Sequence, residues 1–293
     1  MNYRHHYHAG NHADVLKHLV HLSILRALAK KEGGVCVLDT HAGAGVYDLL
    51  APAARKTAEA DAGIQRLLLN AEDAPPLVQD YLAQIATLNT RLGVPRTVTY
   101  YPGSPVITAQ VLRPQDQLIA CEKHPQEADF LRTHFADFTG DAPCATHHTD
   151  GYHAVKAFVP PPKLAGGAGL KRLLVLIDPP FESDADYDAA LKAVKTIHSR
   201  MAQAVVAVWY PIKLRNEADA WLRRIENSGL RKVLNIELIV NDPTRVGGFN
   251  GSGLVILNPP FGLVEALYEP LQWAGKQLSP MQDAVRCEWV VEE

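Results

Sequence analysis

The residues best suited to chemistry follow an apolar segment near the middle of the chain: Asp178, Pro179, Pro180 and Phe181. The apolar segment, 173–177, predicts a strand buried on both faces, and the two prolines end it abruptly. A carboxylate, the Pro179 carbonyl and an aromatic ring held together suit the amino group of a planar heterocycle, because the amine donates to both oxygens while the heterocycle stacks. The alternative is a solvated aspartate at an ordinary strand end, since so short a motif needs its context.

A second pattern lies nearer the N-terminus, where the apolar residues 35–38 precede Asp39 and a Gly-x-Gly turn that starts at Gly43. Glycines in such a turn let the backbone approach a bound cofactor. Asp48 stands where the dinucleotide fingerprint has its third glycine, which argues against NAD. The acid at the strand end suits a cofactor with an amino-acid tail, such as S-adenosylmethionine.

Two more acids follow predicted strands. Glu122 ends the run 117–121, a position from which an acid commonly accepts hydrogen bonds from ribose hydroxyls. It lies well beyond the usual gap of about 20 residues, and an inserted segment accounts for the excess. Asp150 and Gly151 follow a third strand and fall where the base of a cofactor would lie, although an ordinary Asp-Gly turn fits them equally well.

The elements that position these residues are predicted from the spacing of apolar side chains. A helix is expected from His12 to about Lys31, with Asn11 as its N-cap. Strands five to seven are expected at 204–209, 233–240 and 253–257, the last two as an antiparallel hairpin. Together the elements predict an α/β, Rossmann-like fold with a seven-stranded, mostly parallel sheet. In the strand order 3-2-1-4-5, strands one and four flank the ligand crevice, which places Asp178 for chemistry.

The segment 48–97 breaks the alternation of strand and helix. It holds two helical patterns, at about 57–70 and 77–92, and predicts a small helical insertion. The chain then divides into residues 1–47 (tail, first helix, first strand and glycine turn), the insertion, and the remainder of the same domain at 98–293. A passive cap and a substrate-binding role are equally compatible with the insertion.

The bulk composition is that of a globular protein with a sizeable core: 293 residues, 47% hydrophobic and 21% charged. No apolar run approaches the length of a membrane span, and the N-terminus does not resemble a secretory signal, so a cytoplasmic protein without membrane contact is expected. The four cysteines are widely spaced and indicate reduced thiols. The net charge of −3 means that any contact with nucleic acid must use a local patch.

The first 21 residues hold six of the thirteen histidines. No cysteine or paired glutamate accompanies them, so no metal is expected. Arg4, Lys17, His18, Tyr3 and Tyr7 are instead interpreted as a polar lid of some positive character, with a solvated helix face and loose tail as the alternative.

Two aromatic motifs are interpreted as scaffolding. Asn258-Pro259-Pro260-Phe261 repeats the Pro-Pro pattern, but it follows the seventh strand at the sheet edge, far from the glycine turn. Trp209-Tyr210-Pro211 lies at the end of the fifth strand and is more typical of a core and loop than of a platform for a base.

The whole chain resembles the RlmJ (YhiR) family of 23S ribosomal RNA adenine-N6 methyltransferases. The motifs that carry the resemblance occur in the family's order, and they are Tyr3-Arg4-His5, His8 to His18, Leu38 to Gly45, Tyr100 to Pro105, Ile177 to Phe181, Trp209-Tyr210-Pro211 and Asn258 to Phe261. Departures are His6, where the family can carry a smaller residue, and Phe181, where it often has tyrosine.

The resemblance implies a class I methyltransferase dependent on S-adenosylmethionine and without a metal, acting on adenine 2030 of 23S ribosomal RNA as a monomer. The residues implied to line the cofactor site are Lys17, His18, His41, Gly43, Ser104, Glu122, Asp150, Gly151 and Asp178. Asp178 and Pro179 would act on the adenine, Phe181 would stack on it, and Tyr3 with its tail would close over the site. Protein-free or early-assembly RNA is the expected substrate.

The chemistry expected is attack by N6 on the sulfonium methyl. Hydrogen bonds from both N6 hydrogens to Asp178 and Pro179 favour the pyramidal, nucleophilic amine, and positioning supplies much of the rate. The base must leave its stack to reach Asp178. Three rivals remain: a DNA adenine methyltransferase, which would need a recognition domain; a glutamine methyltransferase, which would favour Asn at position 178; and a nucleoside-binding module without catalysis.

Overall fold

The computed structural model describes residues 5–138, 140–163 and 169–292. Its central sheet has eight strands in the order β10-β8-β9-β7-β6-β1-β4-β5. The strands are β1 (Cys36–Asp39), β4 (Gln117–Glu122), β5 (Cys144–His148), β6 (Leu173–Ile177), β7 (Val205–Ile212), β8 (Val233–Ile239), β9 (Gly251–Leu257) and β10 (Val285–Val291).

Strands β5, β4, β1, β6 and β7 are parallel, and β9 pairs antiparallel with both β7 and β8. The predicted order 3-2-1-4-5 and the terminal hairpin are therefore confirmed. The strand count differs, because β10 adds an eighth strand antiparallel to β8. Residues 286–289 of β10 are exposed at the sheet edge, so the apolar run that marks a buried strand is missing there.

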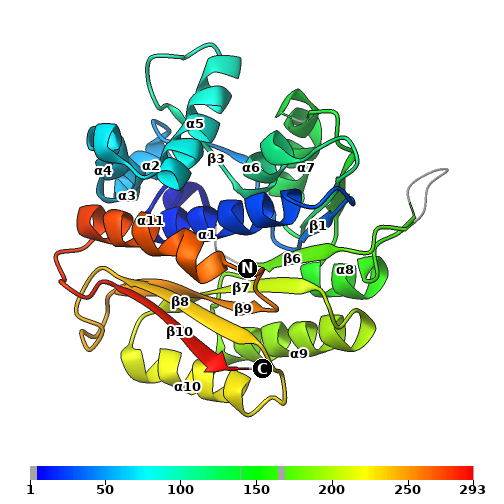
Figure 1. Ribbon diagram of the computed structural model, residues 1–293. Coiled ribbons are helices and arrows are strands. Elements are labelled where there is room, and N and C mark those ends of the chain that lie inside the picture. The colour runs from blue at the N-terminus through cyan, green and yellow to red at the C-terminus, as the bar shows by residue number, and fades with distance from the viewer. Residues whose placement is uncertain (1–4, 139, 164–168, 293) are drawn as a thin grey trace.

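Helices cover both faces of the sheet (Figure 1). One face carries α1 (His12–Ala29), α6 (Ser104–Val111), α7 (Pro125–His134) and α11 (Leu263–Leu278), and the other carries α8 (Gly151–Phe158), α9 (Asp184–Arg200) and α10 (Arg215–Glu226). Strand β6 serves both layers. Its Leu174 and Leu176 join the core beneath α1, while Val175 and Ile177 join the core beneath α9. This two-sided burial is what the continuous apolar run 173–177 predicts.

The segment between β2 (Val46–Asp48) and β3 (Tyr100–Pro102), two strands that pair with each other, is helical. It holds α2 (Pro52–Thr57), α3 (Glu59–Ala62), α4 (Ile64–Leu69) and α5 (Pro76–Arg91), with a 3-10 turn at Ala71–Asp73. Two further 3-10 turns lie outside this segment, at His5–Tyr7 and Phe135–Phe138. The single helix expected at 57–70 is broken at Gly63, where the Ile64 N–H donates to the Gly10 carbonyl at 2.8 Å. The proposed domain boundaries at 48 and 97 stay a prediction.

Across the described ranges, no helix has both the length and the apolar character needed to cross a bilayer.

Candidate active site

A cavity of about 460 Å³ opens at the carboxyl ends of β1, β4 and β6. All the predicted site residues except Tyr3 line it, namely Lys17, His18, His41, Gly43, Ser104, Glu122, Asp150, Gly151, Asp178, Pro179 and Phe181. Tyr3 lies outside the described residues. The fold therefore brings residues as far apart in the sequence as Lys17 and Phe181 around one cavity.

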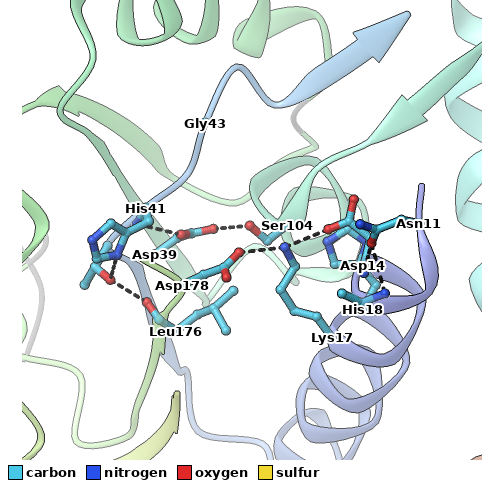
Figure 2. Close-up of polar contacts among 12 residues, drawn as sticks. Asn11, Asp14, Lys17, His18, Asp39, His41, Gly43, Ser104, Leu176 and Asp178 are labelled. Carbon is cyan, nitrogen blue, oxygen red and sulfur yellow. Dashed lines mark hydrogen bonds and ion pairs between the residues drawn. The ribbon is translucent and has the colours of Figure 1, made fainter. Parts of the chain in front are cut away.

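Asp178 is held by the first helix. The Lys17 ammonium lies 2.6 Å from Asp178 Oδ2 and 2.8 Å from Asp14 Oδ1, so one cation serves two carboxylates (Figure 2). Burial by itself lowers the pKa of Lys17, but the two carboxylates outweigh it and hold that pKa well above its ordinary value. Lys17 is therefore charged whenever the protein is folded near neutrality.

Hydrogen bonds at the start of α1 set the direction of the Lys17 side chain. Asn11 Oδ1 accepts from the N–H groups of Ala13 and Asp14 at 2.9 and 3.0 Å, which confirms the predicted N-cap. Asp14 Oδ2 also accepts from the Gly10 N–H at 2.9 Å. Because these bonds fix the first turn, the Lys17 side chain one turn later points into the cavity.

Asp39 lies at the end of β1 beside Asp178. Its Oδ2 accepts from the Ser104 hydroxyl at 2.6 Å, and its Oδ1 accepts from the His41 N–H at 3.2 Å (Figure 2). Complete burial raises the pKa of Asp39 to about 7, against the lowering effect of these hydrogen bonds. Ser104 lines the cavity, and the buried Asp39 lies behind it and holds its hydroxyl in place.

His41 presents an acceptor. The Thr40 hydroxyl donates to the Leu176 carbonyl at 2.8 Å, so its oxygen must accept from His41 Nδ1, also at 2.8 Å. Burial lowers the pKa of His41 to about 4, which leaves the ring neutral with its lone pair on Nε2.

The Glu122 carboxylate binds the backbone of the glycine turn. Its Oε2 accepts from the Gly43 N–H at 2.8 Å and its Oε1 from the His124 N–H at 2.6 Å. Gly43 has φ +60°, a conformation that a side chain would strain. The two backbone bonds orient the carboxylate and leave each oxygen a second lone pair for a ligand.

Asp150 is the N-cap of α8, as its side chain accepts from the Tyr152 and His153 N–H groups. Lys123 Nζ lies 2.9 Å from Asp150 Oδ2. Gly151 packs so closely on β1 that a Cβ there would meet the Thr40 carbonyl oxygen at 2.2 Å. The Asp-Gly pair is therefore a helix start pressed against the glycine turn rather than an isolated loop turn.

His18 and Phe181 are more buried than expected. His18 borders the cavity, but its Nδ1 is 2.8 Å from the hydroxyl of Tyr101. Phe181 is 2% exposed and has φ +46°, and its ring packs against Tyr187 and Trp209 with centroids 4.5 and 6.0 Å apart. Phe181 therefore borders the cavity but packs mainly in the core beneath α9.

One wall of the cavity was not predicted from the sequence. It is formed by Trp209, Pro211, Lys213 and Phe249. The sequence favours a scaffolding role for Trp209, yet this residue borders the cavity. The centroid of the Phe249 ring lies 6.3 Å from that of Trp209 and 4.6 Å from that of His12. The usable signal was the position of Trp209, on the strand next to the one that ends at Asp178.

The second Pro-Pro motif agrees with its structural interpretation. Asn258 Nδ2 donates to the carbonyls of Ala202 and Ala204, both at 2.8 Å. The predicted place at the sheet edge is wrong, because β9 lies between β7 and β8; the motif is away from the cavity because β9 is antiparallel to β7 and ends where β7 begins. Phe261 is fully exposed there.

The N-terminal histidines have acidic partners. His6 Nε2 is 3.1 Å from Glu127, and His8 Nδ1 is 2.9 Å from Glu59. Within the part of the chain that the structure describes, no three His, Cys, Asp or Glu side chains gather as a metal site would require.

The strand order and the cavity at the carboxyl ends of the strands define a class I, Rossmann-like methyltransferase fold. The model of a family described as RsmJ, ribosomal RNA large subunit methyltransferase D, RlmJ, matches residues 32–291. The chain belongs to this family and is a methyltransferase of the RlmJ type, as the resemblance implied.

Individual relatives agree. Proteins described as ribosomal RNA large subunit methyltransferase J from Haemophilus influenzae and Escherichia coli are 38% and 37% identical to this chain, each over 100% of both sequences. The crystal structure of protein LPL1258 from Legionella pneumophila is similar with a TM-score of 0.83 and 32% identity, covering 96% of this chain and 97% of that one.

Proposed function

We propose that this chain transfers a methyl group from S-adenosylmethionine to N6 of one adenine in 23S ribosomal RNA, adenine 2030 by the family resemblance. The observation that carries the proposal is the convergence of Asp178 and Pro179 on the same cavity as Glu122. Family membership supports ribosomal RNA as the substrate class. Protein-free or early-assembly RNA, a monomeric enzyme and a cytoplasmic setting belong to the same proposal.

The residues around the glycine turn fit this cofactor. Glu122 has lone pairs left for the ribose hydroxyls, and the close packing of Gly151 on Thr40 leaves backbone where a side chain would otherwise intrude. Asp39 and Ser104 suit the amino-acid tail, and His41 offers an acceptor. The cofactor, when bound, supplies an electrophilic methyl group on sulfur.

Asp178 has one oxygen on Lys17, and Oδ1 has no hydrogen-bond partner among the described residues. Oδ1 and the Pro179 carbonyl would accept the two N6 hydrogens of the adenine and so favour the pyramidal amine. The ion pair with Lys17 fixes the position of this carboxylate, which limits reorganisation as charge develops on the amine.

The flipped adenine would enter along the wall of Trp209 and Phe249. Phe181 would support that wall through its packing on Trp209, and direct stacking on the base would require its ring to rotate out of the core. Closure by Tyr3 and its tail remains part of the proposal.

Tritium transfer from labelled S-adenosylmethionine tests the proposal. Wild type, Asp178→Ala and, as a matched control, Asn258→Ala would each be incubated with protein-free 23S RNA from cells that lack this gene, and nucleosides would be analysed after digestion. We expect label in N6-methyladenosine with wild type and Asn258→Ala, and none with Asp178→Ala. Label retained by Asp178→Ala would move the catalytic group elsewhere.

Parallel reactions with DNA, assembled subunits and bulk protein separate the rivals. Label only in DNA would support a DNA adenine methyltransferase, and label in protein would support glutamine methylation. Either result would contradict ribosomal RNA as the substrate but would leave the assignment as a methyltransferase intact. Labelling of assembled subunits alone would mean that the enzyme acts at a later stage of assembly than proposed.

A further inference from the structure

The connection between β8 and β9, residues 240–250, forms part of the rim of the cavity. Its last turn carries Phe249, which lines the cavity and packs against His12 at the start of α1. The other end of the connection leaves β8 next to β9, in the antiparallel half of the sheet. We call these residues the 240–250 loop.

The loop is braced from beneath. Asn250 is fully buried, and its Nδ2 donates to the carbonyls of Lys213 at 2.6 Å and Arg245 at 2.8 Å. The Arg215 N–H donates to the Pro243 carbonyl at 2.9 Å. The Arg215 guanidinium is itself clamped by the buried Glu237 carboxylate, at 2.7 and 2.9 Å. These bonds tie the loop to the β7–α10 connection, whose Lys213 lines the cavity together with Phe249 of the loop.

The tip carries a largely exposed apolar side chain. Val246 is 81% exposed, and Gly247, with φ +80°, turns the chain back immediately after it. Arg245 is also exposed, and neither it nor Lys213 forms an ion pair with any residue in the described ranges. Asp242 accepts from the Thr244 N–H and hydroxyl at 2.9 and 2.7 Å. The Asp242 carboxylate is thus hydrogen-bonded within the loop, while Arg245 and Lys213 are available to bind a ligand.

We propose that the 240–250 loop opens the RNA: Val246 enters the base stack at the position that the target adenine leaves, and Arg245 and Lys213 bind the flanking phosphates. This inference rests on the proposed function, since it assigns the RNA contact of that same site. A flipped base leaves a gap that an apolar wedge can fill, which offsets part of the unstacking cost. On a chain of net charge −3, Lys213 in the lining of the cavity and Arg245 in the neighbouring loop supply the local attraction that a phosphate backbone needs.

The wedge is tested with two synthetic RNA hairpins that share one adenine as the only target, paired in the first and bulged in the second. Val246→Ser should lower kcat/KM on the paired hairpin by about tenfold or more, because the unstacking cost is no longer offset, and should change it less than about twofold on the bulged hairpin. Val246→Leu should retain activity on both. Phe261→Ser, an exposed apolar position that follows β9 at the opposite end of the strands from the cavity, is the matched control.

The outcomes separate this inference from the proposed function. If wild type methylates neither hairpin, the proposed function fails. If wild type methylates both and Val246→Ser loses neither or loses both equally, the wedge is overturned. If wild type methylates only the bulged hairpin, the chain does not open a pair and the wedge is again overturned.

The phosphate contact is tested by salt. For Arg245→Ala, the slope of log KM for the paired hairpin against log salt concentration should fall by about one, as expected for one lost phosphate contact. Arg223→Ala, near the C-terminal end of α10, should leave the slope unchanged. An unaltered slope for Arg245→Ala would remove Arg245 from the RNA interface.

Discussion

Lys17 and Asp178 are 161 positions apart in the chain, yet their side chains meet at 2.6 Å in the floor of the cavity. Asp14 shares the same ammonium at 2.8 Å. The helix that opens the chain is therefore bonded to the strand end that carries the proposed chemistry. A buried cation between two carboxylates is stable only as a set, because removing one member leaves an uncompensated charge.

Lys17→Met should lower the free energy of unfolding by about 3–5 kcal/mol, since Asp14 and Asp178 lose their shared cation. Asp14→Asn in the same chain should recover part of that loss by removing one of the two orphaned charges. Urea melts of the two single variants and the double variant measure the coupling. Strictly additive losses would show that the three groups do not act as a set.

Glu122→Gln should raise the Kd for S-adenosylmethionine by about tenfold or more, because a charged acceptor for two hydroxyls becomes a weaker neutral one. Calorimetric titration of the variant measures this. Glu182→Gln replaces another acid on the cavity wall, next to Phe181, and should bind the cofactor as wild type does. Equal affinity in both variants would place the ribose elsewhere.

Gly151→Ala should destabilise the protein by about 1–3 kcal/mol and weaken cofactor binding, because the new Cβ would lie 2.2 Å from the Thr40 carbonyl oxygen and force α8 away from β1. Thermal melts with and without S-adenosylmethionine report both effects. Gly140→Ala is the control, since nothing lies closer than 4.0 Å to its added Cβ. A wild-type melting temperature for Gly151→Ala would contradict the packing of the α8 start on β1.

Stability should fall as the solution is acidified below about pH 6.5, in part through His21. Burial lowers the pKa of His21 to about 3, so the unfolded chain binds a proton there that the folded chain refuses. Between pH 6.5, the ordinary pKa of histidine, and the folded-state pKa of about 3, unfolding takes up one proton at His21. In this range the free energy of unfolding therefore falls by about 1.4 kcal/mol for each pH unit of acidification.

His21→Leu should reduce the slope of the free energy of unfolding against pH by the contribution of one proton. This holds even if the lost hydrogen bond to Thr108 lowers stability at pH 7.5. Urea melts between pH 5 and 7.5 give the slope. His153→Leu removes an exposed ring and should leave it as in wild type. A slope for His21→Leu equal to that of wild type would mean that His21 titrates normally in the folded protein.

Much of the fold could be predicted because its signals are local. The run 173–177 is apolar throughout since both faces of β6 are buried, and Asn11 caps a helix whose first turn needs an acceptor. Strand β10 could not be predicted in the same way, because an edge strand with exposed side chains has little apolar pattern.

The site was predictable only in part. Residues at strand ends, such as Glu122 and Asp178, could be placed because parallel strands bring their carboxyl ends to one edge. The bond between Lys17 and Asp178 and the wall at Phe249 depend on tertiary packing over long sequence separations, which no local spacing encodes. Phe181 is buried and has a left-handed backbone, a conformation that its sequence does not favour.

Helix α1 also packs on α11 and β9, which lie in the last fifth of the chain (Figure 1). During synthesis the apolar face of α1 therefore leaves the ribosome long before the segments that cover it. Lys17 must wait for 161 further residues before its partner exists, and longer before β9 and α11 close the layer. Until β9 and α11 are made, the apolar face of α1 lacks the partners that it has in the folded protein, and this exposed face makes the incomplete chain prone to association.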